Sequence, residues 1–282
     1  MSVIKGSPVS QAICEQVSLK AEALAKRGVE PCLAILRVGN DGSQMAYEKN
    51  AEKRMIANGI KCVKVTLDEG VSQNDFVNEF DKLNEDDKVH GILVLQPLPE
   101  GLSVEPLKSR INPLKDVDAI SPVNLYKVMA GDKSGYAPCT AEGVMEIVDW
   151  LKMDCKGKKC VVVGCSLVVG RPLGLLFLGR DATVTFCHEF TKDTAKEARD
   201  ADILVSAAGV RKLIGVNHVN PDMTVIDVGI NFDENGKMCG DVDFDAVEPL
   251  VKNITPVPGG VGSVTTSVLA KHVIKAAEAL SE

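Results

Sequence analysis

The stretch that most constrains the fold runs from Cys160 to Gly174 and reads CVVVGCSLVVGRPLG. Its apolar residues predict a buried strand from Lys159 to Val163 that ends at Gly164, and a helix is expected to begin near Gly170. A strand, a tight glycine turn and a helix in this order start a mononucleotide-binding βαβ unit, in which the helix N-terminus binds phosphate. The pattern G-x-S-x-x-x-G departs from the common G-x-G-x-x-G, so a plain core strand with a glycine turn remains an alternative.

The residues that follow favour the nucleotide-binding interpretation. Ala182 to Cys187, Asp202 to Ala207 and Met223 to Val228 have the composition of strands, and the spacers between them are polar or helical. This alternation predicts parallel strands joined by crossover helices. Glu189 follows the second strand, about where a dinucleotide site places an acid for the ribose 2′-hydroxyl. The alternative for Glu189 is a solvated loop carboxylate.

Length and composition limit the class of protein. A chain of 282 residues with 45% apolar residues predicts two globular domains. The net charge of −7 and the lack of a basic run argue against a nucleic-acid partner. No signal sequence or membrane-spanning run is present, so the nine scattered cysteines are expected to be reduced thiols in a cytoplasmic protein. The four histidines lack metal-ligand spacing, and no metal is expected.

The first half of the chain predicts a second α/β unit without a glycine phosphate loop. Its strands are expected at Pro31 to Val38, Ile60 to Leu67 and Gly91 to Leu95. Helices are expected over about Pro8 to Lys26, Gln44 to Asn58, Ser72 to Asn84, Pro138 to Leu151 and Val264 to Leu280. We therefore expect one α/β domain over residues 1–137, completed by the C-terminal helix 264–282, and a Rossmann-type domain over residues 138–263.

Short motifs occur in order over nearly the whole chain. They are Val38-Gly39 with Tyr47 downstream, Gly91-Ile-Leu-Val94 before Pro97-Leu98-Pro99, Lys115-Asp-Val-Asp118, Pro138-Cys139-Thr140, Val163-Gly164-x-Ser166-x-x-Val169-Gly170-x-Pro172, Asp227-x-Gly229-Ile230-Asn231, Gly240-Asp241-Val242 and Pro256-Val-Pro-Gly-Gly-Val-Gly262. In these motifs the chain resembles the methylenetetrahydrofolate dehydrogenase/cyclohydrolase family. Their accidental occurrence together and in this order is improbable.

The resemblance implies an oxidoreductase of one-carbon metabolism. Such an enzyme oxidises 5,10-methylenetetrahydrofolate to 5,10-methenyltetrahydrofolate and transfers a hydride to NAD or NADP. The implied fold has an N-terminal folate domain and a C-terminal Rossmann-type domain with the substrate cleft between them. The family is commonly a homodimer.

The resemblance also implies roles for individual residues. Tyr47 would stack on the folate ring system and Asp118 would hydrogen-bond the amino edge of the pterin, and these two are the expected catalytic residues. Their alternatives are a half-buried helix aromatic and a turn cap. The other expected substrate-binding residues are Gln96, Pro258, Gly259 and Gly260. The expected cofactor-binding residues are Gly164, Cys165, Ser166, Gly170, Glu189 and Ile230.

Two departures from the family pattern bear on hydrolysis of the methenyl product. Ala51 stands where the family has a lysine four residues after the tyrosine, and Leu95 stands where it has a glutamine. Gln96 comes one step later, on the opposite face of a strand. Addition of water calls for a general base or acid such as a lysine of lowered pKa, whereas hydride transfer calls for positioning. We therefore expect a dehydrogenase with little or no cyclohydrolase activity.

Two further departures bear on the cofactor. NADP-binding members often carry an arginine just after the first glycine, or a serine or arginine at the end of the second strand, where this chain has Cys165 and Glu189. A carboxylate would repel a 2′-phosphate but accept a hydrogen bond from a free 2′-hydroxyl, which favours NAD. One alternative is a bifunctional, NADP-dependent dehydrogenase and cyclohydrolase in which another group replaces the lysine. A second is a non-catalytic regulator that binds folate or dinucleotide, against which the intact Tyr47 and Asp118 count.

Overall fold

The computed structural model describes residues 2–282, which form two compact units. One unit, named here the three-stranded unit, comprises Ala12–Cys139 and Thr266–Glu282. The other, the six-stranded unit, comprises Thr140–Thr265 together with the residues up to Gln11. The sequence predicted that these first residues belong with the first half, whereas by contact they group with the second. They join the six-stranded unit because β1 (Ser2–Val3) pairs in parallel with β11 (Asn253–Ile254).

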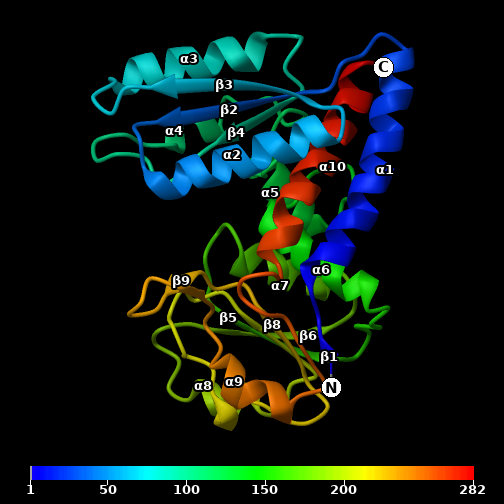
Figure 1. The fold of residues 1–282 in the computed structure, drawn as a ribbon, viewed down its shortest axis with the longest axis vertical. Helices are drawn as coiled ribbons and strands as arrows, with labels where there is room; N and C mark the ends of the chain where they lie inside the picture. The colour runs from blue at the N-terminus through cyan, green and yellow to red at the C-terminus, as the bar shows by residue number, and fades with distance from the viewer. Residues whose placement is uncertain (1) are drawn as a thin grey trace. The chain divides into compact units, whose positions relative to one another are not determined.

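The three-stranded unit is built on a small parallel sheet. Strand β2 (Cys32–Val38) lies between β3 (Lys61–Leu67) and β4 (Gly91–Val94), as the apolar runs of the sequence predict. Helices α2 and α3 cover opposite faces of this sheet (Figure 1). Alternate β2 residues, Ala34 and Leu36 among them, pack with Phe76 of α3 in one apolar core. The helices are α1 (Gly6–Lys26), α2 (Gly42–Ala57), α3 (Gln73–Glu85), α4 (Glu105–Lys108), α5 (Pro122–Ala130) and α10 (Gly262–Leu280).

Side-chain caps fix where the two sheet-covering helices begin. The Asp41 carboxylate accepts hydrogen bonds from the backbone N–H groups of Ser43 and Gln44, at 3.0 and 2.9 Å, so α2 starts directly after β2. Ser72 accepts from the N–H of Asp75 at 3.1 Å and starts α3, as its position in the sequence predicts. The early start of α2 places Tyr47 just beyond the first turn of that helix.

The six-stranded unit is a Rossmann-type sheet with the order β1-β11-β8-β7-β5-β6, in which every pair of neighbours is parallel. Its main strands are β5 (Lys159–Val163), β6 (Thr183–Cys187), β7 (Ile203–Ser206) and β8 (Thr224–Asp227). The chain passes from β5 to β6 on one side and then to β7 on the other. Such a reversal of strand order marks the usual ligand site of a parallel sheet, outside the carboxyl ends of the strands.

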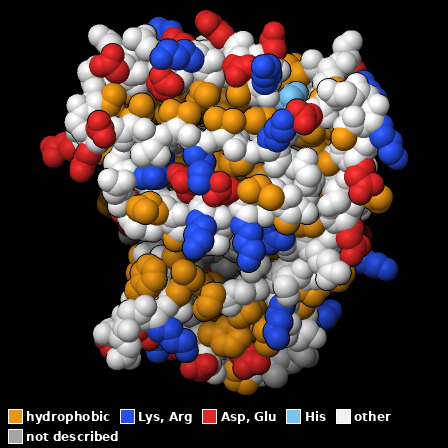
Figure 2. All heavy atoms as spheres, turned by 45° about the horizontal axis from the view of Figure 1, so that its top comes forward, with side chains coloured by type: hydrophobic (Ala, Val, Ile, Leu, Met, Phe, Trp, Pro, Cys, Tyr) orange, Lys and Arg blue, Asp and Glu red, His pale blue; other side chains and the backbone are white. Residues whose placement is uncertain are grey.

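Smaller elements complete this unit. They are the helices α6 (Cys139–Trp150), α7 (Gly170–Leu178), α8 (Thr194–Ala198) and α9 (Phe244–Val247), the 3₁₀ turns η1 (Val216–His218) and η2 (Glu248–Leu250), and an antiparallel pair of β9 (Asn231–Phe232) and β10 (Met238–Cys239). The two-domain α/β fold expected from the sequence is confirmed. Basic and acidic side chains are mixed across the face in Figure 2. Among residues 2–282, no helix combines the length and the apolar character needed to cross a membrane.

Candidate functional site

Tyr47 and Asp118 lie near one another in the three-stranded unit, although they are far apart in sequence. Tyr47 is half-buried on α2. Its burial, the Asp118 carboxylate and the Cys139 thiol raise the pKa of its hydroxyl well above the usual value. The two residues expected to contact folate therefore belong to one unit and influence one another electrostatically.

Hydrogen bonds to the Asp118 side chain and to the carbonyl of the preceding residue, Val117, hold Asp118 in place. Its Oδ1 accepts the N–H of Cys139 at 2.8 Å, so it also caps the start of α6. The carbonyl of Val117 accepts from the thiol of Cys139 at 3.3 Å and from Nδ1–H of His272 at 2.8 Å. Burial raises the pKa of Asp118, while hydrogen bonds from Cys139 oppose that rise. Asp118 is therefore a cap for α6, the alternative role that the sequence allowed, and it also acts electrostatically on Tyr47.

Replacing Asp118 by alanine is expected to weaken folate binding by roughly 1–3 kcal/mol, because the pterin donors would lose their acceptor. Titration of a folate substrate into the variant measures this loss, and dinucleotide affinity serves as the internal control.

In the natural chain the carboxylate form is the acceptor, so folate affinity should fall as the pH drops through the raised pKa of Asp118. Asp118→Asn should remove that pH dependence. Unchanged folate affinity in Asp118→Ala would exclude Asp118 from the site.

The two positions that depart from the family pattern are both buried. The exposed fractions are 0% for Ala51 and 5% for Leu95. Gln96 and Lys53, the polar residues beside them in sequence, are both exposed.

Gln44 is a buried polar residue that the sequence analysis missed. It is 5% exposed, and its Nε2 donates to the carbonyl of Pro97 at 2.7 Å, which ties α2 to the segment after β4. Its Oε1 has no hydrogen-bond partner among the described residues. The signal available in the sequence was its spacing of three residues before Tyr47, which puts both side chains on one side of α2.

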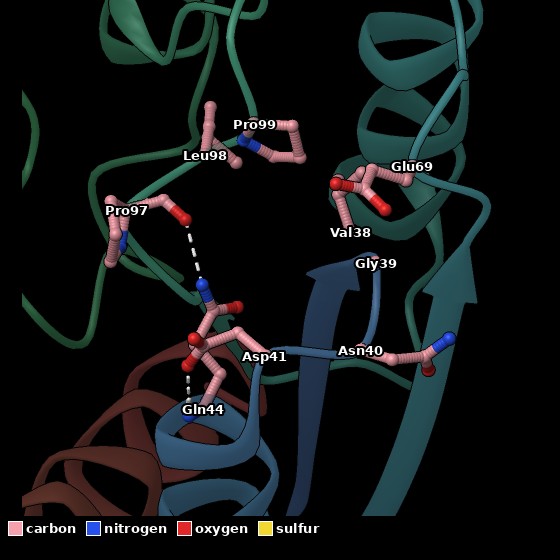
Figure 3. A pocket seen from close by; sticks show the side chains of 9 residues that line it. All are labelled: Val38, Gly39, Asn40, Asp41, Gln44, Glu69, Pro97, Leu98 and Pro99. Atoms are coloured by element: carbon pink, nitrogen blue, oxygen red, sulfur yellow. Dashed lines mark hydrogen bonds between the residues drawn. The ribbon is translucent and has the colours of Figure 1, made fainter.

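Gln44 also borders a cavity of about 350 Å³ at the carboxyl end of β2. Figure 3 shows its amide directed at Pro97 and, across the opening, Glu69 beside Val38 and Gly39. The lining residues are Val38, Gly39, Asn40, Asp41, Gln44, Glu69, Pro97, Leu98 and Pro99. The volume is at the lower end of the range for small-molecule sites. Neither Tyr47 nor Asp118 is among the lining residues.

A buried ion pair fixes α2 on the sheet. Arg37 of β2 donates through Nε to the carboxylate of Glu48 at 2.8 Å, and both side chains are about nine-tenths buried. The same guanidinium donates to the carbonyl of Gly39 and to the hydroxyl of Thr66. Because Glu48 follows Tyr47, this pair restrains the part of α2 that carries the tyrosine.

In the six-stranded unit, the glycines of the β5–α7 turn are required by close backbone contact. A Cβ at Gly164 would lie 2.2 Å from the carbonyl oxygen of Ala207, and one at Gly170 would lie 1.8 Å from the carbonyl oxygen of Gly164. The turn is exposed between them, and the N–H groups of Ser166, Leu167 and Val168 donate no hydrogen bond within residues 2–282. Free N–H groups before a helix N-terminus fit a phosphate. The turn therefore suits a dinucleotide.

Glu189 and Arg171 both lie close to Cys165 in this turn. The Glu189 carboxylate contributes to raising the pKa of the Cys165 thiol, after the larger effect of burial, and the Arg171 guanidinium opposes it. Arg171 also donates through Nε to the carbonyl of Cys165 at 2.9 Å. Glu189 and Arg171 therefore act electrostatically, in opposite directions, on the same residue of the glycine turn.

The remaining expected site residues are placed in one unit or the other. Ile230 follows β8 and is 63% exposed, while Pro258, Gly259 and Gly260 also belong to the six-stranded unit. Gln96 belongs to the three-stranded unit with Tyr47 and Asp118. Within residues 2–282, no three His, Cys, Asp or Glu side chains gather to form a possible metal site.

Comparison with protein families gives matches to both halves of the chain. Residues 4–118 match the catalytic domain of tetrahydrofolate dehydrogenase/cyclohydrolase, and residues 138–281 match its NAD(P)-binding domain. The bifunctional protein FolD of Alkaliphilus metalliredigens is 49% identical over 274 residues, covering 97% of this chain and 96% of the relative. The protein of the same name from Clostridioides difficile is 47% identical with the same coverage.

Solved structures agree with these matches. The bifunctional FolD of Campylobacter jejuni superposes with a TM-score of 0.97 at 39% identity, covering 99% of both chains. The Trypanosoma brucei dehydrogenase-cyclohydrolase, complexed with NADP and an inhibitor, gives a TM-score of 0.94 at 34% identity and covers 99% of this chain and 97% of its own. The NAD-dependent methylenetetrahydrofolate dehydrogenase of Saccharomyces cerevisiae shares the fold, with a TM-score of 0.83 at 18% identity over 99% of this chain and 98% of its own.

Proposed function

Because the chain belongs to the tetrahydrofolate dehydrogenase/cyclohydrolase family, we propose that it oxidises 5,10-methylenetetrahydrofolate to 5,10-methenyltetrahydrofolate with NAD as the favoured hydride acceptor. The observation that carries this proposal is the proximity of Tyr47 and Asp118 within the unit that matches the catalytic domain. A silent regulator would have no need to keep an aromatic ring and a buried carboxylate together.

The reaction asks this chain for positioning. The methylene carbon lies between two nitrogens, whose lone pairs help it release a hydride and leave a delocalised cation, so no protein acid or base is required. The bound dinucleotide supplies the hydride acceptor. Tyr47 stacks on the folate ring system and Asp118 accepts from the amino edge of the pterin. The exposed N–H groups after Gly164 hold the diphosphate.

The preference for NAD rests on the charge beside the glycine turn. Glu189 lies near Cys165, where it accepts a hydrogen bond from a free ribose 2′-hydroxyl and repels a 2′-phosphate. Arg171 is the group that favours the alternative, because its guanidinium is close to the same residue. NADP is the cofactor in the Trypanosoma brucei structure, so the choice in this chain depends on which of the two charges faces the ribose.

We further propose that cyclohydrolase activity is weak or absent, because buried apolar side chains occupy positions 51 and 95. The second candidate function is the bifunctional enzyme. The names of the relatives from Alkaliphilus metalliredigens and Clostridioides difficile favour it, since both are called bifunctional. Under that alternative, a group other than a lysine at position 51 must serve as the base.

The deciding experiment is a steady-state assay with 5,10-methylenetetrahydrofolate and either NAD or NADP. Absorbance of the reduced nicotinamide should rise with enzyme concentration, faster with NAD than with NADP at equal concentration. If the protein binds folate or dinucleotide but the absorbance changes with neither NAD nor NADP, the protein is a regulator and the dehydrogenase proposal is wrong. Heat-denatured protein is the control.

A further inference from the structure

The buried carboxylate of Asp241 joins the two loops that follow β7 and β8. Asp241 is 0% exposed, and no cation pairs with it among the described residues. Instead it accepts five hydrogen bonds. The donors are Ser206 Oγ at 3.0 Å, the N–H groups of Ala208, Gly209 and Val210 at 2.7, 3.1 and 2.9 Å, and Asn231 Nδ2 at 2.9 Å. A carboxylate with this many donors is fixed in position.

These loops lie at the edge of the sheet where the strand order reverses. The loop after β7 also contacts the glycine turn after β5, because a Cβ at Gly164 would meet the carbonyl of Ala207 at 2.2 Å. Asp241 therefore holds Ala208 and Gly209 behind the turn that is expected to bind the diphosphate. The same carboxylate holds Asn231, next to the exposed Ile230.

A second carboxylate, that of Asp227, fixes Asp241 in turn. It accepts the N–H groups of Gly229, Asp241 and Val242 at 2.9, 3.0 and 2.9 Å. The fit is reciprocal, because a Cβ at Gly229 would lie 2.0 Å from Asp241 Oδ1, and one at Gly240 would lie 1.9 Å from Asp227 Oδ2. No side chain can be accommodated at either glycine without moving a carboxylate.

Ile230 is thus presented by neighbours that both contact Asp241. Gly229 packs against the carboxylate and Asn231 donates to it, while the Ile230 side chain between them is exposed. We propose that Asp241 is a positioning residue for the dinucleotide, which sets the spacing between the loop after β7 and the Ile230 loop. This inference rests on the proposed function only in placing a nicotinamide dinucleotide at this edge of the sheet.

The test is Asp241→Asn, which keeps the size of the side chain but points an N–H₂ group at backbone N–H donors. Titration of NADH followed by its fluorescence should show a dissociation constant raised roughly tenfold or more. The affinity for a folate substrate should stay within about twofold. Asp245→Asn, on the exposed side of α9, is the matched control and should bind NADH like the natural chain.

Asn231→Ala provides a second variant in case Asp241→Asn does not fold. It removes only the donor that joins Asp241 to the Ile230 loop. We expect a rise of roughly threefold in KM for the dinucleotide and an increased deuterium isotope effect on hydride transfer, because the nicotinamide is held less well. If the role of Asp241 were purely structural, the melting temperature would change, but dinucleotide binding would not weaken more than folate binding.

NADH affinity unchanged in Asn231→Ala and in folded Asp241→Asn would overturn the inference, as would an equal loss of folate and NADH affinity. The NADH titration does not depend on turnover. If the natural chain binds NADH without oxidising the folate, the proposed function fails while the inference about Asp241 is still decided by the variants. If the natural chain does not bind NADH, both are wrong.

Discussion

Glu189→Arg is expected to shift the ratio of kcat/KM for NAD over NADP toward NADP by roughly a hundredfold or more. At an effective dielectric of about 20, two unit charges about 4 Å apart interact by about 4 kcal/mol. Solvent at this exposed position reduces the effect to about 1–3 kcal/mol, so the natural chain should prefer NAD by about tenfold to a hundredfold. The arginine removes the repulsion and adds an attraction. Parallel steady-state assays of both chains with the two dinucleotides measure the shift.

This prediction would fail if Arg171, rather than Glu189, faced the ribose of the dinucleotide. The Arg171 guanidinium donates to the carbonyl of Cys165 at 2.9 Å, so it is a cation beside the glycine turn. If the natural chain prefers NADP, and Arg171→Ala abolishes that preference, then Arg171 rather than Glu189 faces the ribose and our assignment is wrong. Lys192→Ala is the matched control, since Lys192 is an exposed cation nearby in sequence.

The second large effect concerns the methenyl product, which should accumulate during turnover and decay only at its spontaneous rate. Ala51 and Leu95 offer no group that can take or give a proton. Ala51→Lys is not expected to restore hydrolysis, because Leu95 stands where the family has the glutamine that would partner the lysine. The measurement is the decay of methenyl absorbance over a range of enzyme concentrations.

Decay of the methenyl product in proportion to enzyme concentration would contradict this expectation and support the bifunctional alternative. Lys53 would then be the first candidate for the base, and Lys53→Ala should abolish the enzyme-dependent decay. Lys49→Ala is the matched control, because Lys49 is also exposed on α2. A decay that survives both substitutions would place the base elsewhere.

The sequence predicted the main strands because their apolar runs are long enough to form a pattern. Lys159–Val163 is a strand as expected, and Ser72 caps α3 as its spacing indicated. The pairing of β1 with β11 could not be predicted, since each strand has two residues and neither shows a period. Strand order in such cases is decided by tertiary contact rather than by local propensity.

The candidate site was predictable to a different extent. The family resemblance singled out Tyr47 and Asp118, which influence one another electrostatically in the folded chain, and Glu189 was singled out by its position after a strand. The role of Asp241 could not be read from the sequence, because its donors come from two segments, residues 206–210 and Asn231, that meet it only in the folded chain. Gln44 was missed for the same reason, since its partner is a carbonyl oxygen of Pro97.

The pairing of β1 with β11 has a practical consequence for handling this enzyme. The N–H of Ile4 donates to the carbonyl of Ile254 and that of Gly6 to the carbonyl of Gly259, so residues 4–6 support the loop that carries Pro258, Gly259 and Gly260. A purification tag fused close to Ser2, or a truncation that removes Ile4, would disturb this loop along with the sheet edge. Glu282 is exposed, and a tag placed after it leaves these contacts intact.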